Sequence, residues 1–432
     1  MSAARGAFLA MLSAGLLAAQ QPSQTSAMMG ATAAPGGKLL DVEFYGEILG
    51  VYDSGIAPAG QPSRAPGALY GLESGAGASI FRRWRHAQLA VEYKGRFRDY
   101  TEPALFNGTE QYLDLLFRVQ LQRHLALAVA ETAGTTTVAT GSLISLGGEQ
   151  SGLFALPTDD VFEIRTNYAE STVNLIWQIE PHLSIDLGGE GFVVRRDSFV
   201  LAGLDGYRAH AVLSFRFSAH QTLLAAYEHT FFDFQRVFGN SELDTAYLGY
   251  GLQLRRNLDL SLEAGGSRVA SLGLATVALD PAIAAIIGRG TALIAQRQIL
   301  YAPLLDARLV EHLRNGSLRL GVFTNMSPGN GAALTSRQTA TTLAYSYTGN
   351  RGLTVSWNAG YSRLSPIGQG TGAYASFNGG AGITYRLFKD THLELRYDFR
   401  HYTTQNFFST KDSTRVTVGL AYGSADAPLS AR

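Results

Sequence analysis

The chain has 432 residues, balances 35 Lys and Arg against 35 Asp and Glu, and contains no cysteine. Balanced charge argues against a nucleic-acid partner, because such partners require a basic patch or a basic excess. The absence of cysteine excludes disulfide bonds, thiolate metal ligands, thiol catalysis and a lipid-modified N-terminal cysteine.

The N-terminus has the pattern of an export signal. One basic residue, Arg5, precedes an apolar run over residues 7–19 and a polar stretch over residues 20–26. This order predicts a cleaved signal peptide over residues 1–27, followed by a short linker over residues 28–37. Beyond it, no segment approaches the roughly 18 uninterrupted apolar residues of a membrane-spanning helix. If the mature chain crosses a membrane, it has to do so with strands.

The segment 87–98 alternates between apolar and charged residues. Successive side chains of a strand point to opposite faces, so this segment predicts a strand with one apolar and one charged face. The same pattern returns in the segment 391–402. The charged faces of these two strands supply our candidates for side chains that line a polar interior: Glu92, Lys94, Arg96, Arg98, Glu394, Arg396, Asp398 and Arg400.

Similar alternation recurs along the whole chain. In these further segments the alternating apolar residues begin at Leu113, Val173, Leu183, Tyr207, Ala246, Leu318, Leu353, Phe377 and Val416. Many of these segments run to about ten residues, which is longer than strands of soluble sheets and close to the length that a tilted membrane-crossing strand needs.

The connections between these segments alternate between short and long. Short turns are expected near residues 83–85, 123–124, 180–182, 219–220, 256–257, 315–316, 350–352 and 389–390. The intervening stretches are longer and rich in Gly, Ser, Thr, Pro and Asp. The pattern predicts an all-β fold: a single transmembrane antiparallel up-and-down β-barrel over residues 38–422, with 18 strands, 16 as the alternative, and both ends on the short-turn side.

One long connection, expected over residues 271–296, is apolar rather than polar. Asp280 and Pro281 precede Ile283, Ile286 and Ile287, an order that predicts a short helix with Asp280 as its N-cap. One interpretation is a segment folded into the barrel that narrows it. The other is an element at the rim that packs on neighbouring loops, and the sequence leaves both open.

No motif for catalysis, a cofactor or a metal ion stands out. There is no phosphate-binding loop and no cluster of His, Asp or Glu with metal-ligand spacing. We therefore expect a protein that is not an enzyme and has no cofactor. We also expect the inward charges to neutralise one another across and along strands, rather than to select a solute.

From residue 38 to residue 422 the chain resembles bacterial outer-membrane β-barrels of the porin-like class. The last strand, with Val416, Val418, Leu420 and Tyr422 on one face, is similar to the signal that barrel-assembly machinery reads, although a tail over residues 423–432 follows it. The resemblance implies an outer-membrane location, with membrane lipid and the assembly machinery as partners. It implies a pore for small polar solutes or a secretion-associated barrel, for instance for surface polysaccharide. The alternative is a barrel that carries an enzyme or adhesin on its long extracellular loops; the oligomeric state stays open.

Overall fold

The computed structural model describes residues 40–54, 68–101, 107–137, 164–199, 201–280, 282, 285–286, 288–331, 334–350, 352–367, 373–404 and 411–423. The predicted signal peptide, the predicted linker and residues 424–432 of the predicted tail lie outside this described part. Within it, the barrel runs from Leu40 to Gly423. None of the described segments is a helix long and apolar enough to span a membrane.

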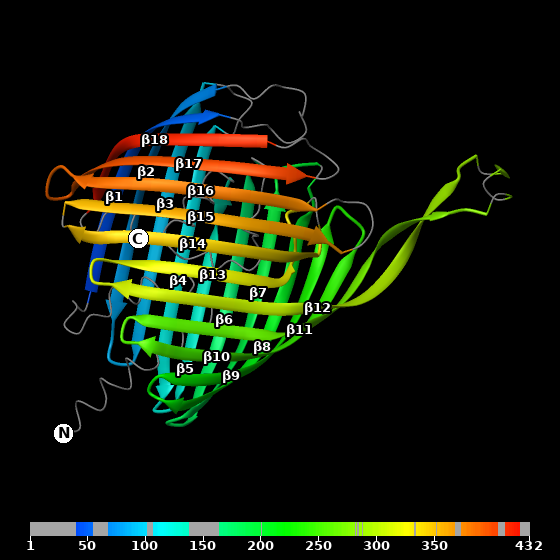
Figure 1. The fold of residues 1–432 in the computed structure, drawn as a ribbon, viewed down its shortest axis with the longest axis horizontal. Coiled ribbons are helices and arrows are strands. Elements are labelled where there is room, and N and C mark those ends of the chain that lie inside the picture. Colours follow the sequence, from blue (N-terminus) through cyan, green and yellow to red (C-terminus); the bar gives the residue numbers. More distant parts are fainter. Residues whose placement is uncertain are drawn as a thin grey trace.

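A single sheet of 18 strands forms the fold (Figure 1). The strands are β1 (Leu40–Ser54), β2 (Ala68–Arg83), β3 (Ala87–Tyr100), β4 (Gly108–Gln122), β5 (Leu125–Thr136), β6 (Thr166–Glu180), β7 (Leu183–Arg196), β8 (Gly203–Ser218), β9 (Gln221–Gln235), β10 (Asn240–Arg255), β11 (Leu258–Ala278), β12 (Thr291–Leu313), β13 (Gly316–Ser327), β14 (Ser336–Asn350), β15 (Leu353–Pro366), β16 (Tyr374–Arg386), β17 (Thr391–Thr404) and β18 (Lys411–Gly423).

The sheet closes on itself. Each strand pairs antiparallel with its neighbours in sequence, and β1 also pairs with β18, where Tyr45 lies opposite Gly423 and Ser54 opposite Thr414. Closure lets the strands of the wall satisfy one another's backbone hydrogen bonds without leaving an edge. The prediction of one antiparallel barrel with 18 strands is confirmed.

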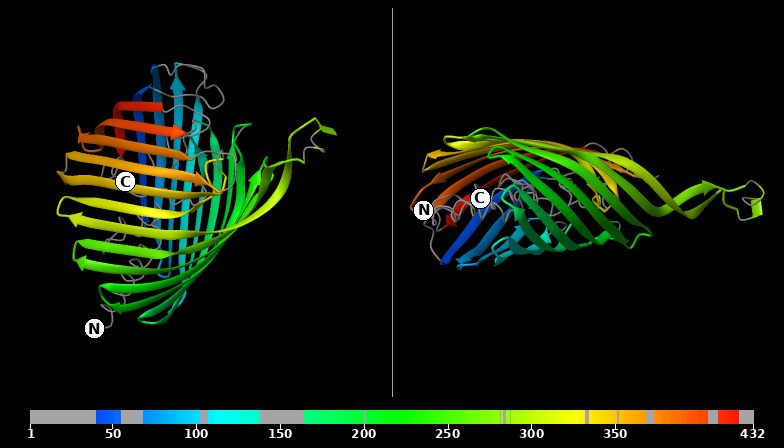
Figure 2. Two further views of the ribbon diagram at one scale, coloured as in Figure 1. Left: turned by 45° about the vertical axis from the view of Figure 1, so that its right-hand side comes forward. Right: turned by 90° about the horizontal axis from the view of Figure 1, so that it is seen from below.

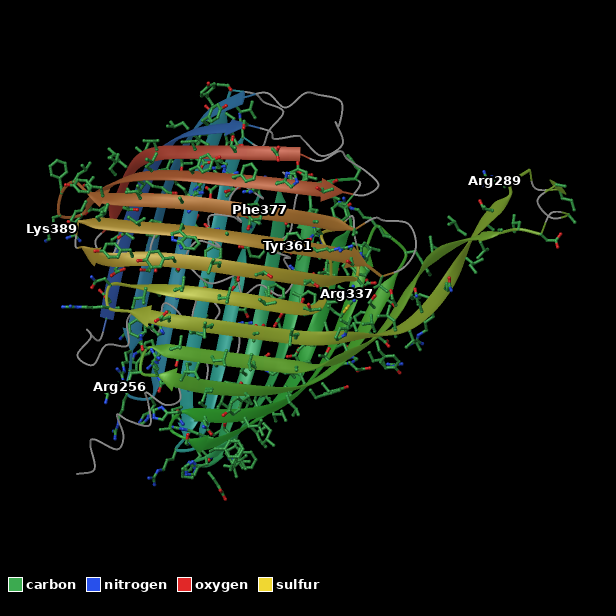
Figure 3. The ribbon with its side chains drawn as sticks, viewed as in Figure 1. Arg256, Arg289, Arg337, Tyr361, Phe377 and Lys389 are labelled. Carbon is green, nitrogen blue, oxygen red and sulfur yellow. The ribbon has the colours of Figure 1, made fainter. Side chains whose placement is uncertain are left out.

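The two faces of the wall differ in polarity, because successive side chains along a strand point to opposite sides. On the outer face, Tyr361 and Phe377 are 46% and 43% exposed (Figure 3). On β3, Phe97 faces outward and is exposed, while its neighbours Arg96 and Arg98 point inward and are partly or fully buried. An apolar exterior around a charged interior is the distribution of a barrel that is surrounded by lipid.

Short turns join alternate strands at one end of the barrel. Residues 123–124, 181–182, 219–220, 256–257 and 314–315 form two-residue turns, and Figure 3 shows Arg256 and Lys389 at this end. The backbone N–H of Gly423 donates to the carbonyl oxygen of Asp390, 2.9 Å away, in the connection between β16 and β17. Because β1 runs antiparallel to β18, both ends of the described barrel lie on the short-turn side, as predicted.

Strands β11 and β12 extend beyond the wall as a two-stranded arm, defined here as residues 273–297 (Figures 1 and 2). β10 accompanies β11 only as far as Leu272, and β13 accompanies β12 only from Leu305. Pro303, which has no N–H to donate, lies two residues before the point where pairing with β13 begins.

The arm corrects one sequence prediction. Residues 271–296 were expected to be a connection, but β11 and β12 pair with each other out to Ala278 and Thr291, so the connection is only residues 279–290. Leu, Ile, Val and Thr are frequent on both sides of it and favour strands. The alternation that marks the other strands is weak here, because neither face of the arm packs against a barrel core.

Candidate functional site: the barrel interior

The charged side chains proposed from the sequence lie on the inward faces of β3 and β17. Arg98 and Asp398 are buried, and the other six are partly buried. Outward neighbours such as Tyr93 and Tyr397 are exposed. Within each strand the structure brings some of the candidates together. Lys94 Nζ lies 2.6 Å from Glu92 Oε1, and the Arg396 guanidinium makes two bonds to the Asp398 carboxylate, at 2.6 and 2.5 Å.

Glu73 of β2 is the centre of a larger ion-pair network. Its side chain is fully buried, and Oε1 lies 3.1 Å from Arg98 Nε and 2.7 Å from Arg415 Nη2. The Tyr100 hydroxyl donates to the same oxygen at 3.0 Å. Glu73 and Arg415 are 342 positions apart in the chain and meet only because β1 pairs with both β2 and β18. Neither Glu73 nor Arg415 is among the candidates predicted from the sequence, although each is a charged residue inside a segment that becomes a strand.

The network extends on both sides of the seam where the barrel closes, which is the pairing of β1 with β18. Arg96 Nη2 lies 2.6 Å from Glu47 Oε1, and Arg98 Nη1 lies 3.3 Å from Glu110 Oε1. We call this set the Glu73 network; it comprises Glu47, Asp53, Glu73, Arg96, Arg98, Tyr100, Glu110 and Arg415. Its four carboxylates and three guanidinium groups nearly cancel. This supports the interpretation that the inward charges mainly neutralise one another.

Glycines on β2 make room for this network. A Cβ on Gly75 would lie 2.8 Å from Glu47 Oε1, and a Cβ on Gly71 would lie 2.5 Å from a ring carbon of Tyr100. Both glycines alternate with Glu73 on the inward face, so the neighbouring side chains lie directly on the backbone of β2. Larger residues at these two positions would displace the groups that hold Glu73.

The opposite wall carries separate charge pairs. Glu190 of β7 pairs with Arg208 of β8, and the Tyr247 hydroxyl donates to Glu228 Oε1 at 3.0 Å. These groups lie level with one another in the sheet, since Glu190 is directly opposite Arg208. Charged groups therefore occupy the interior on both sides of the barrel.

The connection between β13 and β14, residues 328–335, folds against the inside of the wall at the long-loop end. We call it the inner segment; residues 332–333 of it are outside the described part. Asn330 is fully buried, the Ala202 N–H donates to the Gly331 carbonyl oxygen at 3.0 Å, and Thr335 Oγ1 donates to Ser241 Oγ at 2.6 Å. Ala202 immediately precedes β8, and Ser241 is the second residue of β10. The inner segment thus reaches strands that lie several places away in the sheet.

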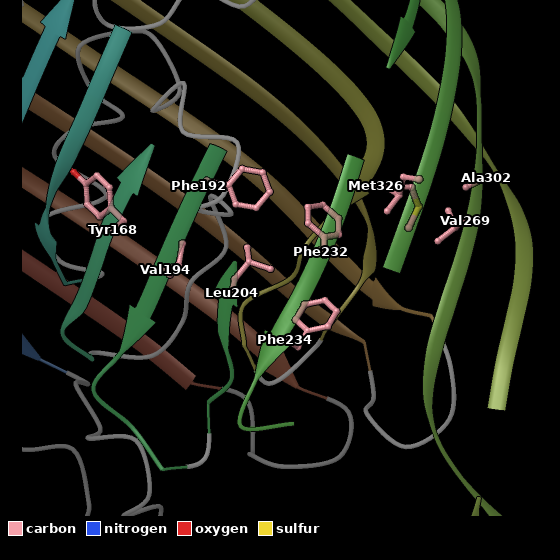
Figure 4. Close-up of a cluster of buried hydrophobic side chains, with 10 residues drawn as sticks. Tyr168, Phe192, Val194, Leu204, Phe232, Phe234, Val269, Ala302 and Met326 are labelled. Atoms are coloured by element: carbon pink, nitrogen blue, oxygen red, sulfur yellow. The ribbon is translucent and has the colours of Figure 1, made fainter. Parts of the chain in front are cut away.

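An apolar cluster, whose side chains Figure 4 shows, packs against this inner segment. Phe232 and Val269 are fully buried on the inner wall, and Leu334 of the inner segment packs against the cluster. The cluster consists of Tyr168, Phe192, Val194, Leu204, Phe232, Phe234, Leu243, Val269, Ala302 and Met326. The interior is therefore not polar throughout, and the inner segment covers part of this apolar cluster.

Two glycines allow the inner segment its path. Gly329 and Gly331 have φ values of 78° and 86°, in the left-handed region that glycine adopts without a steric penalty. A Cβ on Gly331 would lie 2.9 Å from the Ala202 carbonyl oxygen and 3.1 Å from the Arg196 side chain. The run Pro-Gly-Asn-Gly at residues 328–331 marks a turn in the sequence, but nothing in it indicates which wall the turn packs on.

The segment that the sequence singled out for narrowing the lumen lies elsewhere. Asp280 Oδ1 accepts a hydrogen bond from the Ala282 N–H at 2.8 Å, as expected for a helix cap, and Ile286 is 85% exposed. Pro281, Ile283 and Ile287 are outside the described residues. The described residues between Ala278 and Thr291 lie at the end of the arm, where Figure 3 labels Arg289, whereas the inner segment between β13 and β14 contacts the inside of the wall.

The described residues offer no metal centre, because none of their His, Asp and Glu side chains form a group of three or more with suitable geometry. His229 Nδ1 lies 2.9 Å from Asp244 Oδ1, but this pair is on the outer face of the wall and is joined there by Arg268. It forms a partly exposed charge cluster on the outside of the barrel.

No protein-family model and no curated relative matches the chain. Among solved structures, the outer membrane protein opdK from Pseudomonas aeruginosa is similar at 12% identity and a TM-score of 0.44, over 89% of this chain and 99% of that one. A BenF-like porin from Pseudomonas fluorescens Pf-5 is similar at 10% identity and a TM-score of 0.45, over 89% of this chain and 98% of that one. Pseudomonas aeruginosa OccK2 (OpdF), solved in complex with glucuronate, is similar at 11% identity and a TM-score of 0.45, over 89% of this chain and 98% of that one.

Proposed function

We propose that this chain forms a pore for small polar solutes in a bacterial outer membrane. The observation that carries the proposal is the closed wall of 18 strands with an exposed apolar outside and charged groups inside. Barrels of 16 to 18 strands are wide enough to leave an aqueous channel. Short turns at one end and longer connections at the other give the orientation, with the short turns in the periplasm.

In this proposal the inward candidates on β3 and β17 line the pore, together with the Glu73 network. The inner segment narrows the long-loop entrance. The N-terminal signal peptide directs export and is removed, and the apolar face of β18 with Val418, Leu420 and Tyr422 is read during assembly into the membrane. Because the inner segment lies in this entrance, the proposed cargo is a small solute rather than a secreted polymer.

Single-channel recording tests the pore. Purified full-length protein added to a planar bilayer should give discrete conductance steps, and heat-unfolded protein should give none. Swelling of proteoliposomes in glucuronate, and in an uncharged sugar of similar size, would then rank the solutes. If neither the intact protein nor a variant without residues 328–335 conducts, a pore is ruled out.

A surface adhesin is the second candidate, and one observation favours it. The arm projects from the long-loop end and exposes apolar side chains, including Ile286 and Leu293, and the adjoining part of β12 exposes Tyr301. Apolar surface of this extent in water marks a site of contact with another protein. The pore and the adhesive arm are compatible, because they occupy different parts of the molecule.

A further inference from the structure

The outer edge of β12 is open over a long stretch. Residues 291–304 pair with β11, and the ladder with β13 begins only at Leu305. Among the described residues, no other strand pairs with this stretch, which we call the free edge. An open edge exposes unpaired N–H and C=O groups and templates the addition of another strand. Natural proteins usually protect such edges with charges or proline, yet the free edge carries one charged residue, Arg297, and one proline, Pro303, near its barrel end.

The sequence of the free edge is nearly the same in both directions. Read outward from Arg297, the residues on the two sides are Gln296 and Gln298, Ala295 and Ile299, Ile294 and Leu300, Leu293 and Tyr301, and Ala292 and Ala302. Each pair matches polar with polar or apolar with apolar. An antiparallel pair of identical strands related by a two-fold axis brings such residues directly opposite each other.

We propose that the free edge of β12 pairs antiparallel with the free edge of a second copy of this chain, about a two-fold axis at Arg297. Leu293 of each copy then lies opposite Tyr301 of the other, and both side chains are on the outer face of β12. Leu293 and Tyr301 are 66% and 79% exposed in the single chain. Pairing would cover the open edge and part of this apolar surface.

The one unfavourable contact is central. Arg297 would face Arg297 of the second copy, and like charges directly opposite each other are destabilising. Each Arg297 already has a partner on its own chain, because its Nη2 lies 3.4 Å from Glu242 Oε2. The axis therefore carries two neutralised pairs rather than two bare cations.

The geometry fixes how the two barrels would lie. In an antiparallel pair they are at opposite ends of the joined arms, as copies in two facing membranes would be. Residues 292–302 are about 37 Å long and, in a sheet about 10 Å thick, present on the order of 400 Å² per copy. Stable interfaces bury about 800 Å² per partner, so this contact should form and dissociate reversibly.

Single cysteines test the register, since the natural chain has none. In detergent-solubilised full-length protein under mild oxidation, Arg297→Cys alone should form a disulfide-linked dimer. Leu293→Cys and Tyr301→Cys should each stay monomeric alone and crosslink when the two are mixed. Pairing raises the local thiol concentration to about 1 mM, so at about 10 μM protein these crosslinks should form about a hundredfold faster than by collision.

Phe199→Cys is the matched control, because this fully exposed residue lies outside the arm. A variant with residues 271–298 replaced by Asn-Gly should remain monomeric in light scattering and keep its barrel, seen as heat-modifiable migration on denaturing gels. The proposal is overturned if Arg297→Cys crosslinks no faster than Phe199→Cys. It is equally overturned if Leu293→Cys alone crosslinks as fast as the mixture. Neither result depends on whether the barrel conducts.

Discussion

Replacing Glu73 by Ala should destabilise the barrel more than any other single charge removal in its interior. The substitution leaves Arg98 and Arg415 buried without the carboxylate that lies between them. Breaking a buried ion pair by removing one partner costs about 3–5 kcal/mol, because the remaining charge is uncompensated. Glu73→Gln should cost less, since the amide oxygen still accepts the hydrogen bonds from Arg415 and Tyr100.

Urea unfolding of protein refolded into lipid vesicles measures this effect as a loss in the free energy of unfolding. The matched control is Glu92→Gln, which also removes an inward carboxylate of the same seam. Its partner Lys94 is 42% exposed and can be solvated by water, so the cost should stay below about 1 kcal/mol. Equal losses for Glu73→Ala and Glu92→Gln would show that the Glu73 network does not hold the seam.

A double variant separates charge from packing. In the Glu73→Ala background, adding Arg415→Met removes one of the two stranded cations and should recover part of the lost stability. Arg415→Met alone should be destabilising, because Glu73 and Asp53 lose a partner. Such opposite signs in two backgrounds are the signature of direct coupling between the residues.

The barrel wall could be predicted from the sequence because its signal is local. In β17, Leu395 and Tyr397 alternate with Arg396 and Asp398. The apolar residues face the outside of the barrel and the charged residues face its interior, so neighbouring residues distinguish the two faces of the strand. The same rule failed in the arm. There both faces of the hairpin meet the same surroundings, so Leu293 and Ile294 follow one another without a polar residue between them.

The interior could be predicted only in part, because its contacts join distant segments. Alternation assigned Arg96 and Arg98 to the inward face, but it did not indicate that Glu73 and Arg415 would meet there across the closing seam. The apolar connection at Asp280 was the more suggestive candidate for narrowing the barrel. Its own hairpin carries it away from the wall, whereas the inner segment has an apolar cluster to cover.

Removing the inner segment should enlarge the pore. Ser327 lies opposite Ser336, so residues 328–335 can be replaced by Asn-Gly, the sequence that favours a two-residue hairpin turn, without changing the strand register. We expect higher single-channel conductance and faster passage of larger sugars. Loss of the cover also brings water to Phe232 and Val269, and each apolar side chain so exposed should lower the free energy of unfolding by up to about 3 kcal/mol.

The arm supplies the matched control. Ala278 lies opposite Thr291, so residues 279–290 can be replaced by the same Asn-Gly turn. That variant also removes a connection at this end of the barrel, but this connection projects away from the interior. It should conduct as the natural protein does, and its stability should be unchanged because Ile286 covers no apolar cluster. If shortening the arm raised conductance and removing the inner segment did not, the narrowing element would be at Asp280 after all, and the position of the inner segment in the lumen would have no bearing on passage.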